Sequence, residues 1–181
     1  MDTAGEPVLD PGPEAPPPAG APWFGDFARA ERRSLVAFAW SLTGDLGAAE
    51  DLAQEALEAA WRQWGRVGGY DRPGTWARRV VANRAAGRSR RSGRERRANG
   101  RWFGRGDAVV TLDPPDDEFW TAVRGLPARQ AQAVALHYLE DRSVADIAAV
   151  LGCAEATVRV HLHRGRLALA RTLGLTEGDE R

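Results

Sequence analysis

The sequence predicts an all-α fold made of two small helical domains joined by a flexible linker. In two separate stretches, apolar residues recur three and four positions apart, which is the spacing of helices that bury one face. Between these stretches, residues 99–115 are rich in Gly, Pro and acids, as linkers are. No long run alternates apolar and polar residues in the manner of a strand. We therefore expect one domain at residues 23–98 and another at residues 116–173.

The first domain is expected to follow a disordered acidic tail, residues 1–22, which holds seven of the eleven prolines. Three helices are predicted after this tail, at about 23–43, 46–65 and 75–97. Asp45 precedes the second helix and can cap its first turn, because a short acidic side chain accepts from exposed backbone N–H groups. Gly87 weakens the second half of the third helix, since glycine is a poor helix former.

The second domain is predicted to contain four shorter helices, before a C-terminal tail at 174–181. They are expected at about 116–124, 127–140, 144–151 and 155–173. Pro127 suits the first turn of its helix, and Ser143 with Asp146 makes a capping box for the next one. Gly152 ends that helix. The segment SVADIAAVLGCAEATVRVHLHRGR (143–166) therefore has the layout of a helix-turn-helix.

The net charge of zero conceals a basic block between two acidic ones. Residues 72–105 carry twelve Arg and one acid, whereas residues 1–22 and 107–118 are acidic. All 25 basic residues of the chain are Arg, which is also what GC-rich coding DNA would produce. The position of these arginines is therefore more informative than their number, and a block of one sign indicates a polyanionic partner.

Several classes of protein are disfavoured. The single cysteine, Cys153, excludes an internal disulfide or a Cys-based zinc site and is expected to be a packing residue. His161 and His163 lie two positions apart on a helix and point in different directions, so no metal site is expected. No nucleophile with a partner base, cofactor motif or phosphate loop is found. We therefore expect no catalytic residue, cofactor, enzyme activity or small-molecule substrate.

No signal peptide or apolar run long enough to span a bilayer is recognisable in the sequence. We therefore expect a cytoplasmic protein that makes no contact with a membrane.

The second helix of the helix-turn-helix is expected to present a basic face. Arg159, His163 and Arg166 follow one another at spacings of four and three, with Val160 and Arg164 beside them. Such a helix fits the major groove, where Arg contacts guanine edges or phosphates. The alternative is an ordinary helical hairpin with a solvated basic side.

Two polar surfaces of the first domain remain open to either interpretation. Asp51, Gln54, Glu55 and Glu58 form one stripe on the second helix, which on composition alone is better explained as an ordinary solvated acidic side. The third helix places Trp76, Val80 and Asn83 near one face. They are interleaved with four basic residues, Arg78, Arg79, Arg84 and Arg88. Interleaved aromatic and basic residues hold single-stranded nucleic acid, but a Trp is also a common core residue.

Three strings together resemble the extracytoplasmic-function (group 4) sigma factors of bacterial RNA polymerase. They are AEDLAQEALEAAW (49–61), TWARRVVANRAAGRSRR (75–91) and LPARQAQAVALHYLEDRSVADIAAVLGCAEATVRVHLHRGR (126–166). The resemblance covers about residues 24–97 and 116–173. It implies a promoter-recognition factor that binds core RNA polymerase and promoter DNA, with an anti-sigma factor as a further partner.

The same resemblance implies a role for each candidate site residue. The polymerase-binding set is Asp51, Gln54 and Glu55. The minus-ten set, which opens and holds DNA, is Trp76, Arg79, Asn83, Arg84 and Arg88. The minus-thirty-five set is Arg159, Val160, His163, Arg164 and Arg166. Some positions depart from the family pattern: Ala154 replaces a capping Ser, and Val160 replaces a Ser or Thr.

Two other interpretations stay open at this point. One is a LuxR-like helix-turn-helix regulator that binds operators without joining polymerase, which TVRVHL (157–162) would suit. The other is a scaffold that has kept the fold but lost promoter activity. Residues 49–91 discriminate against the LuxR-like regulator, because such a protein has no need of an acidic stripe followed by an Arg- and Trp-bearing helix.

Overall fold

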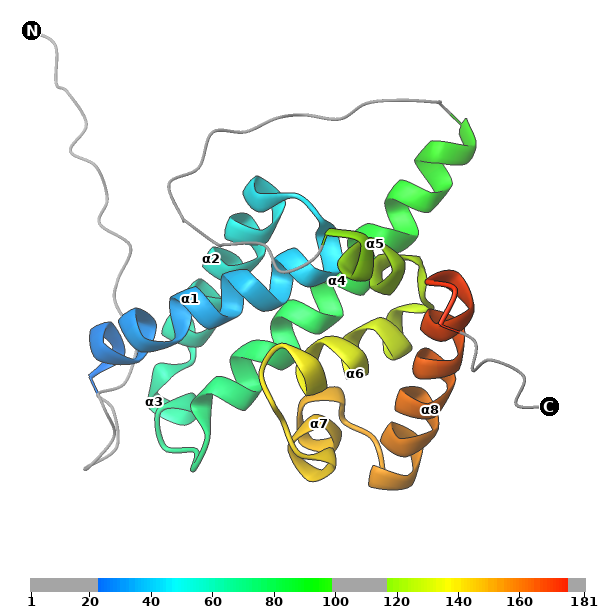
Figure 1. Cartoon of the computed structure of the whole chain (residues 1–181). Helices are drawn as coiled ribbons and strands as arrows, with labels where there is room; N and C mark the ends of the chain where they lie inside the picture. Colours follow the sequence, from blue (N-terminus) through cyan, green and yellow to red (C-terminus); the bar gives the residue numbers. More distant parts are fainter. Residues whose placement is uncertain (1–22, 99–116, 176–181) are drawn as a thin grey trace, which may run out of the picture.

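The computed structural model describes residues 23–98 and 117–175, and all regular structure within them is helical (Figure 1). The helices are α1 (Phe24–Thr43), α2 (Leu46–Arg62), α3 (Trp64–Val67), α4 (Pro73–Ala98), α5 (Asp117–Gly125), α6 (Ala128–Tyr138), α7 (Val144–Leu151) and α8 (Glu155–Thr172). The predicted all-α class is therefore confirmed. The N-terminal tail, the linker and residues 176–181 of the C-terminal tail lie outside the described residues.

Helices α1 to α4 form the first helical set, and local signals explain their ends. Gly44 adopts the left-handed conformation (φ 71°) and closes α1, while the Asp45 carboxylate accepts from Ala48 N at 2.7 Å and starts α2. The second predicted helix is interrupted at Gln63, so that α3 forms a separate turn. This turn buries Trp64 beside Phe27 of α1, with ring centroids 4.8 Å apart.

Helices α5 to α8 form the second set, in which α7 and α8 make the helix-turn-helix. Ser143 Oγ accepts from Asp146 N at 3.1 Å, and Gly152 (φ 66°) ends α7, as predicted. Pro127 is the residue before α6 and not its first-turn residue. A Cβ on Gly165 would lie 2.9 Å from Val134 Cγ2, so only glycine lets α8 approach α6 this closely.

The two helical sets pack against each other. Helix α4 runs between α1 and α2 on one side and α6 and α7 on the other, while α1 also contacts α5 and α6 (Figure 1). The buried Gln132 side chain of α6 donates to Ala82 O of α4 at 2.6 Å. One continuous hydrophobic core spans both sets. This interface was not predicted, because the sequence indicates only a flexible linker between the two domains.

Helical periodicity locates the face that α4 buries within its own domain, around Ala77 and Val81. It does not show that a neighbouring face, with Arg78, Arg79 and Ala82, packs against a second domain. In the described ranges, none of the helices is long and apolar enough to cross a membrane.

Candidate polymerase and nucleic-acid interfaces

The helix-turn-helix is held together by apolar residues on the facing sides of its two helices. Ile147, Ala148 and Leu151 of α7 and Val158 and Leu162 of α8 are buried. The opposite side of α8 is exposed and carries the complete predicted minus-thirty-five set: Arg159, Val160, His163, Arg164 and Arg166. Ala154 offers α8 no side-chain cap, so the first N–H groups of this helix have no hydroxyl acceptor from that position.

Among the described residues, the polar contacts of Arg159 and Arg166 on α8 are made within the second domain. Arg159 Nη2 lies 2.8 Å from Glu155 Oε2, one turn earlier on the same helix. Arg166 is directed towards the end of α6, where its Nε donates to Tyr138 Oη at 2.9 Å and its Nη2 lies 3.0 Å from His137 Nε2. The Arg166 guanidinium also lies over the Tyr138 ring, 5.6 Å from its centroid. Arg166 therefore braces α8 against α6.

In the first domain, two predicted surfaces are joined to each other. Arg84 and Arg88 of α4 both form ion pairs with Glu55 of α2, the latter at 2.7 Å. Burial raises the pKa of Glu55, but hydrogen bonds and charges from the two arginines outweigh it and hold the pKa below its ordinary value. A residue assigned to polymerase is therefore the ion-pair partner of two residues assigned to DNA, and its single charge offsets half of theirs. Because the partners come from different helices, sequence spacing gave no sign of this pairing.

Arg79, the third arginine of the minus-ten set, contacts the second domain. Its Nη2 donates to Ala149 O and its Nε to Val150 O at 3.2 Å. These carbonyls lie in the last turn of α7, where backbone acceptors have no partner within the helix. The other two members of the set are Asn83, which is exposed like Arg79, and Trp76, which is half-buried against the core.

The remaining members of the polymerase-binding set lie on the exposed side of α2. Asp51 and Gln54 are exposed, and Gln54 Nε2 donates to Glu58 Oε1 at 3.1 Å. Next to Gln54, three apolar side chains, Phe24, Leu57 and Trp61, line a shallow depression between α1 and α2. The sequence analysis did not assign these apolar residues to a surface. Leu57 and Trp61 follow Gln54 at helical spacings of three and seven, which is the signal that could have found them.

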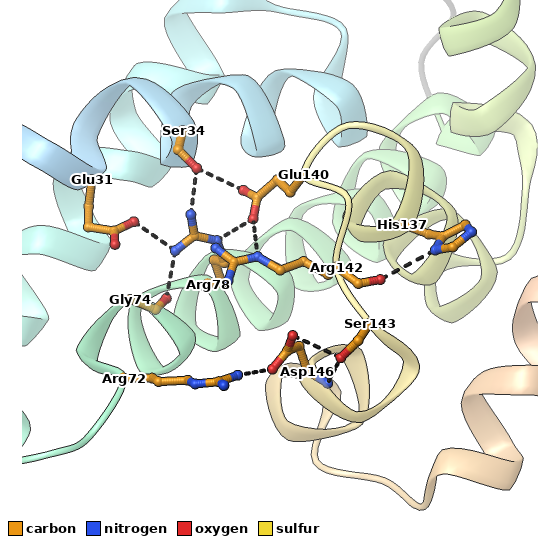
Figure 2. Close-up of polar contacts among 10 residues, drawn as sticks. All are labelled: Glu31, Ser34, Arg72, Gly74, Arg78, His137, Glu140, Arg142, Ser143 and Asp146. Atoms are coloured by element: carbon orange, nitrogen blue, oxygen red, sulfur yellow. Dashed lines mark hydrogen bonds and ion pairs between the residues drawn. The ribbon is translucent and has the colours of Figure 1, made fainter.

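A buried polar cluster at the junction of the domains was not predicted (Figure 2). Its centre is Arg78, whose side chain is only 3% exposed. The guanidinium donates to Glu31 Oε2 at 2.7 Å, to Ser34 Oγ at 2.5 Å and to Gly74 O at 3.1 Å. It also forms an ion pair with Glu140 of the second domain. Burial lowers the pKa of Arg78, but Glu140 and then Glu31 outweigh this and raise it above its usual value, so the group is always charged.

The segment between α6 and α7 supplies the second domain's side of this cluster (Figure 2). Glu140, itself 7% exposed, also accepts from Arg142 Nε at 3.1 Å and from Ser34 Oγ at 2.9 Å. Asp146 forms a more exposed ion pair with Arg72. The hydrogen bond from Ser143 is the main cause of a lowered Asp146 pKa, and Arg72 adds to it although burial opposes both.

Helix α8 carries two histidines, His161 and His163, for which no metal site was expected. Among the described residues, no group of three or more His, Cys, Asp or Glu is placed to hold a metal ion. His161 is half-buried, and its Nδ1 has no hydrogen-bond partner. Burial, followed by the positive charges of Arg129 and Arg164, lowers the pKa of His161, which favours the neutral imidazole.

Comparison with known proteins assigns both helical sets. The family described as Sigma-70 region 2 matches residues 27–95, and the family described as Sigma-70, region 4 matches residues 116–169. The chain is 33% identical over 148 residues to the ECF RNA polymerase sigma factor SigL of Mycobacterium tuberculosis, which covers 77% of this chain and 82% of SigL. It is 31% identical over 162 residues to SigE of Mycolicibacterium smegmatis, covering 82% and 60% of the two chains.

A solved structure is also similar. It is the sigma factor RpoE of Bartonella quintana in complex with the anti-sigma factor NepR, with a TM-score of 0.65 and 28% identity. The match covers 87% of this chain and 98% of that one. The chain spans between 40% and 60% of the length of several of the curated relatives that it matches.

Proposed function

The chain belongs to the extracytoplasmic-function (ECF) sigma factors of bacterial RNA polymerase, and we propose on this premise that it binds core RNA polymerase and directs it to a set of promoters. The observation that carries the proposal is the match to region 2 followed by region 4, with the basic side of α8 exposed. A LuxR-like regulator would not need the first of these regions. The proposal assigns no catalytic residue and no cofactor, and it places the chain in the cytoplasm with the polymerase.

Each surface receives one role in this proposal. Asp51, Gln54 and Glu55 of α2 bind polymerase, which is supported by their common face beside the apolar depression. Helix α8 enters the major groove of the minus-thirty-five element with its exposed basic side. Its contacts are made by Arg159, Val160, His163, Arg164 and Arg166.

The minus-ten element is assigned to α4. Asn83 holds an unpaired base by its amide, while Trp76 contacts or supports the opened strand. Arg79, Arg84 and Arg88 contact the backbone. Removing a base from the stack costs a few kcal/mol, which these contacts must repay. An anti-sigma factor is proposed as a further partner, by analogy with RpoE, which was solved with NepR.

Run-off transcription tests this function directly. The chain and its cognate core RNA polymerase are incubated with fragments of genomic DNA, and discrete transcripts that need both components are expected. Asp51→Arg should abolish these transcripts and the capture of polymerase, because it reverses the charge of an exposed α2 residue without touching the Glu55 ion pairs. Glu118→Arg, at an exposed acid of α5, is the matched control and should keep both. Absence of any dependent transcript would reject the function, and normal polymerase capture by Asp51→Arg would reject the assigned surface.

A further inference from the structure

Arg166 of α8 is held by another helix, whereas Arg159 pairs with an acid one turn earlier on α8 itself. We propose that His137 and Tyr138, the last two residues of α6, are positioning residues for promoter binding. They hold the Arg166 guanidinium in the orientation in which it contacts a phosphate of the DNA backbone. This inference rests on the proposed function and adds two residues of α6 to the minus-thirty-five surface.

Two neutral groups of α6 accept hydrogen bonds from Arg166. Its Nε donates to Tyr138 Oη at 2.9 Å, and its Nη2 lies 3.0 Å from His137 Nε2. A guanidinium has donors and no acceptor, so His137 Nε2 must be the accepting nitrogen, and the ring proton must lie on Nδ1. That Nδ1 lies 3.3 Å from Arg142 O, which accepts its hydrogen bond. The network therefore fixes both the tautomer and the ring orientation of His137.

The Tyr138 ring is itself held by α5. It contacts the ring of Phe119, with centroids 6.2 Å apart and planes at 77°, and Phe119 packs against the core. The Arg166 guanidinium lies 5.6 Å from the centroid of the Tyr138 ring, which adds a cation–π attraction. The neighbouring Gly165 lets α8 approach α6, because a Cβ there would lie 2.9 Å from Val134 Cγ2. Helices α5, α6 and α8 together therefore determine where this guanidinium lies.

The two contacts orient the guanidinium without neutralising it. Tyr138 and the neutral His137 ring carry no charge, whereas the partner of Arg159 is a carboxylate, that of Glu155. Of the five N–H groups of a guanidinium, α6 takes the one on Nε and one on Nη2. The donors on Nη1 and the second donor on Nη2 contact no acceptor among the described residues. Arg166 is exposed, so its charge and these adjacent donors are available to an anion.

The position of Arg166 along α8 indicates which anion. A recognition helix contacts base edges with its N-terminal residues, and α8 begins at Glu155, so Arg166 lies about three turns beyond that end. It is therefore placed for the DNA backbone, whose contacts fix the register of the helix. A long side chain loses rotamer freedom when it binds. Holding Arg166 in place beforehand should therefore strengthen promoter binding by about two- to tenfold.

Substitutions at the end of α6 separate these contacts. His137→Gln keeps an amide oxygen near the Nε2 position as an acceptor for Arg166. His137→Asn keeps a donor near the Nδ1 position for Arg142 O but loses that acceptor. Tyr138→Phe removes the hydroxyl and keeps the ring. Arg166→Met removes the charge, and Arg171→Met is its matched control, because Arg171 is another exposed arginine of α8 without a role in the proposed surface.

Run-off transcription over a series of template concentrations measures the effects, with the full chain bound to core RNA polymerase and a promoter fragment found by the run-off experiment above. The half-saturating template concentration reports promoter affinity, and the rate at saturation reports later steps and the active fraction. His137→Asn and Tyr138→Phe should raise the half-saturating concentration by about two- to tenfold at an unchanged saturating rate, whereas His137→Gln should stay within about twofold of the parent. Arg166→Met should also flatten the dependence of affinity on salt by about one, which Arg171→Met should leave unchanged.

A double-mutant cycle shows whether the two residues of α6 act through Arg166. In the Arg166→Met background, His137→Asn and Tyr138→Phe should cause no further loss of promoter affinity. A further loss in that background, a loss confined to the saturating rate, or equal affinities of His137→Gln and His137→Asn would overturn the inference. Equal salt dependence of Arg166→Met and Arg171→Met would overturn it too. Each of these results leaves the proposed function standing, because the parent still transcribes. A parent that yields no dependent transcript would instead overturn the proposed function, and this inference with it.

Discussion

Helices α4 and α8 both present arginines that the family resemblance assigns to DNA, but the two helices use them differently. On α4, Arg79, Arg84 and Arg88 bind partners on other helices, namely the end of α7 and Glu55 of α2. On α8, Arg159 pairs with its own helix, and Arg166 with the end of α6 in the same domain. His163 and Arg164 are exposed.

The difference separates two requirements for binding DNA. Helix α8 has its basic side exposed while the two helical sets are packed together. Under the proposed function, Arg79, Arg84 and Arg88 of α4 would have to exchange their intramolecular acceptors for DNA acceptors. An arginine-rich segment in a sequence is thus not equivalent to an available positive surface, because folded neighbours can take up the donors first.

The largest effect that this comparison predicts is on stability, at Arg78. Arg78→Met should lower the free energy of unfolding by about 3–5 kcal/mol, because it leaves the buried Glu140 carboxylate and Glu31 without their shared partner. Chemical denaturation measures the loss. Arg29→Met is the control: its ion pair with Asp26 is exposed, so a loss below about 1 kcal/mol is expected. If the free energy of unfolding fell by the same small amount in both variants, the Arg78 side chain would have to be hydrated in solution.

A second pair of variants compares the two helices directly. Arg159→Ala should weaken binding to a minus-thirty-five duplex by about 1–3 kcal/mol while leaving stability nearly unchanged. Arg79→Ala should do the opposite: it removes two hydrogen bonds to α7 and lowers the free energy of unfolding by about 1 kcal/mol, without affecting that duplex. Fluorescence anisotropy and denaturation measure the two quantities. If Arg79→Ala weakened duplex binding and Arg159→Ala lowered stability instead, the roles assigned to the two helices would have to be exchanged.

Replacing one glycine on each helix by alanine should change the free energy of unfolding by a smaller amount, and the sign of the change should differ between the two helices. A methyl group at Gly165 of α8 would meet Val134, a stiff β-branched side chain, so Gly165→Ala should cost about 1–2 kcal/mol. At Gly87 of α4 a Cβ meets nothing within 4 Å, and Gly87→Ala should stabilise the chain by about 0.5–1 kcal/mol through helix propensity. Thermal unfolding should therefore shift down for one variant and up for the other. A shift in the same direction would contradict the packing at one of the two sites.

The smallest predicted effect depends on pH and is confined to α8, since α4 contains no histidine. Because the pKa of His161 is lowered on folding, the unfolded chain binds a proton more readily than the folded chain below about pH 6.5. This contribution to stability is therefore complete above that pH and is lost as the pH falls. Denaturation at several pH values should show a shallower slope for His161→Gln than for the parent. A slope in His161→Gln equal to that of the parent would reject the assignment.

Local signals in the sequence predicted most of the secondary structure. Asp45, Ser143 and Gly152 act at helix ends through their own backbone neighbours, so their roles need no knowledge of the tertiary fold. The interruption at Gln63 was missed, because it depends on Trp64 reaching the core beside Phe27. Burial of Ile147 and Val158 likewise agrees with the helical spacing of the apolar residues around them.

The relations between surfaces could not be predicted in the same way. Arg78 was grouped with other basic residues, although it is a buried ion-pair residue, because its partners Glu31 and Glu140 lie 47 positions before it and 62 positions after it. The pairing of Glu55 with Arg84 and Arg88 is also non-local. Periodicity reports which side of one helix is apolar. It carries no information on which neighbouring helix packs against the polar side of that helix.

The order of Arg78's partners along the chain has a consequence for synthesis on the ribosome. Glu31, Ser34 and Gly74 precede Arg78, so the guanidinium has three acceptors as soon as α4 is made. Glu140 follows 62 residues later, which at usual elongation rates is roughly 3–12 s. During that interval α1 and α4 can assemble around Arg78 without the second domain. The contact between Arg78 and Glu140 can therefore form only after the residues of the other three contacts have been made.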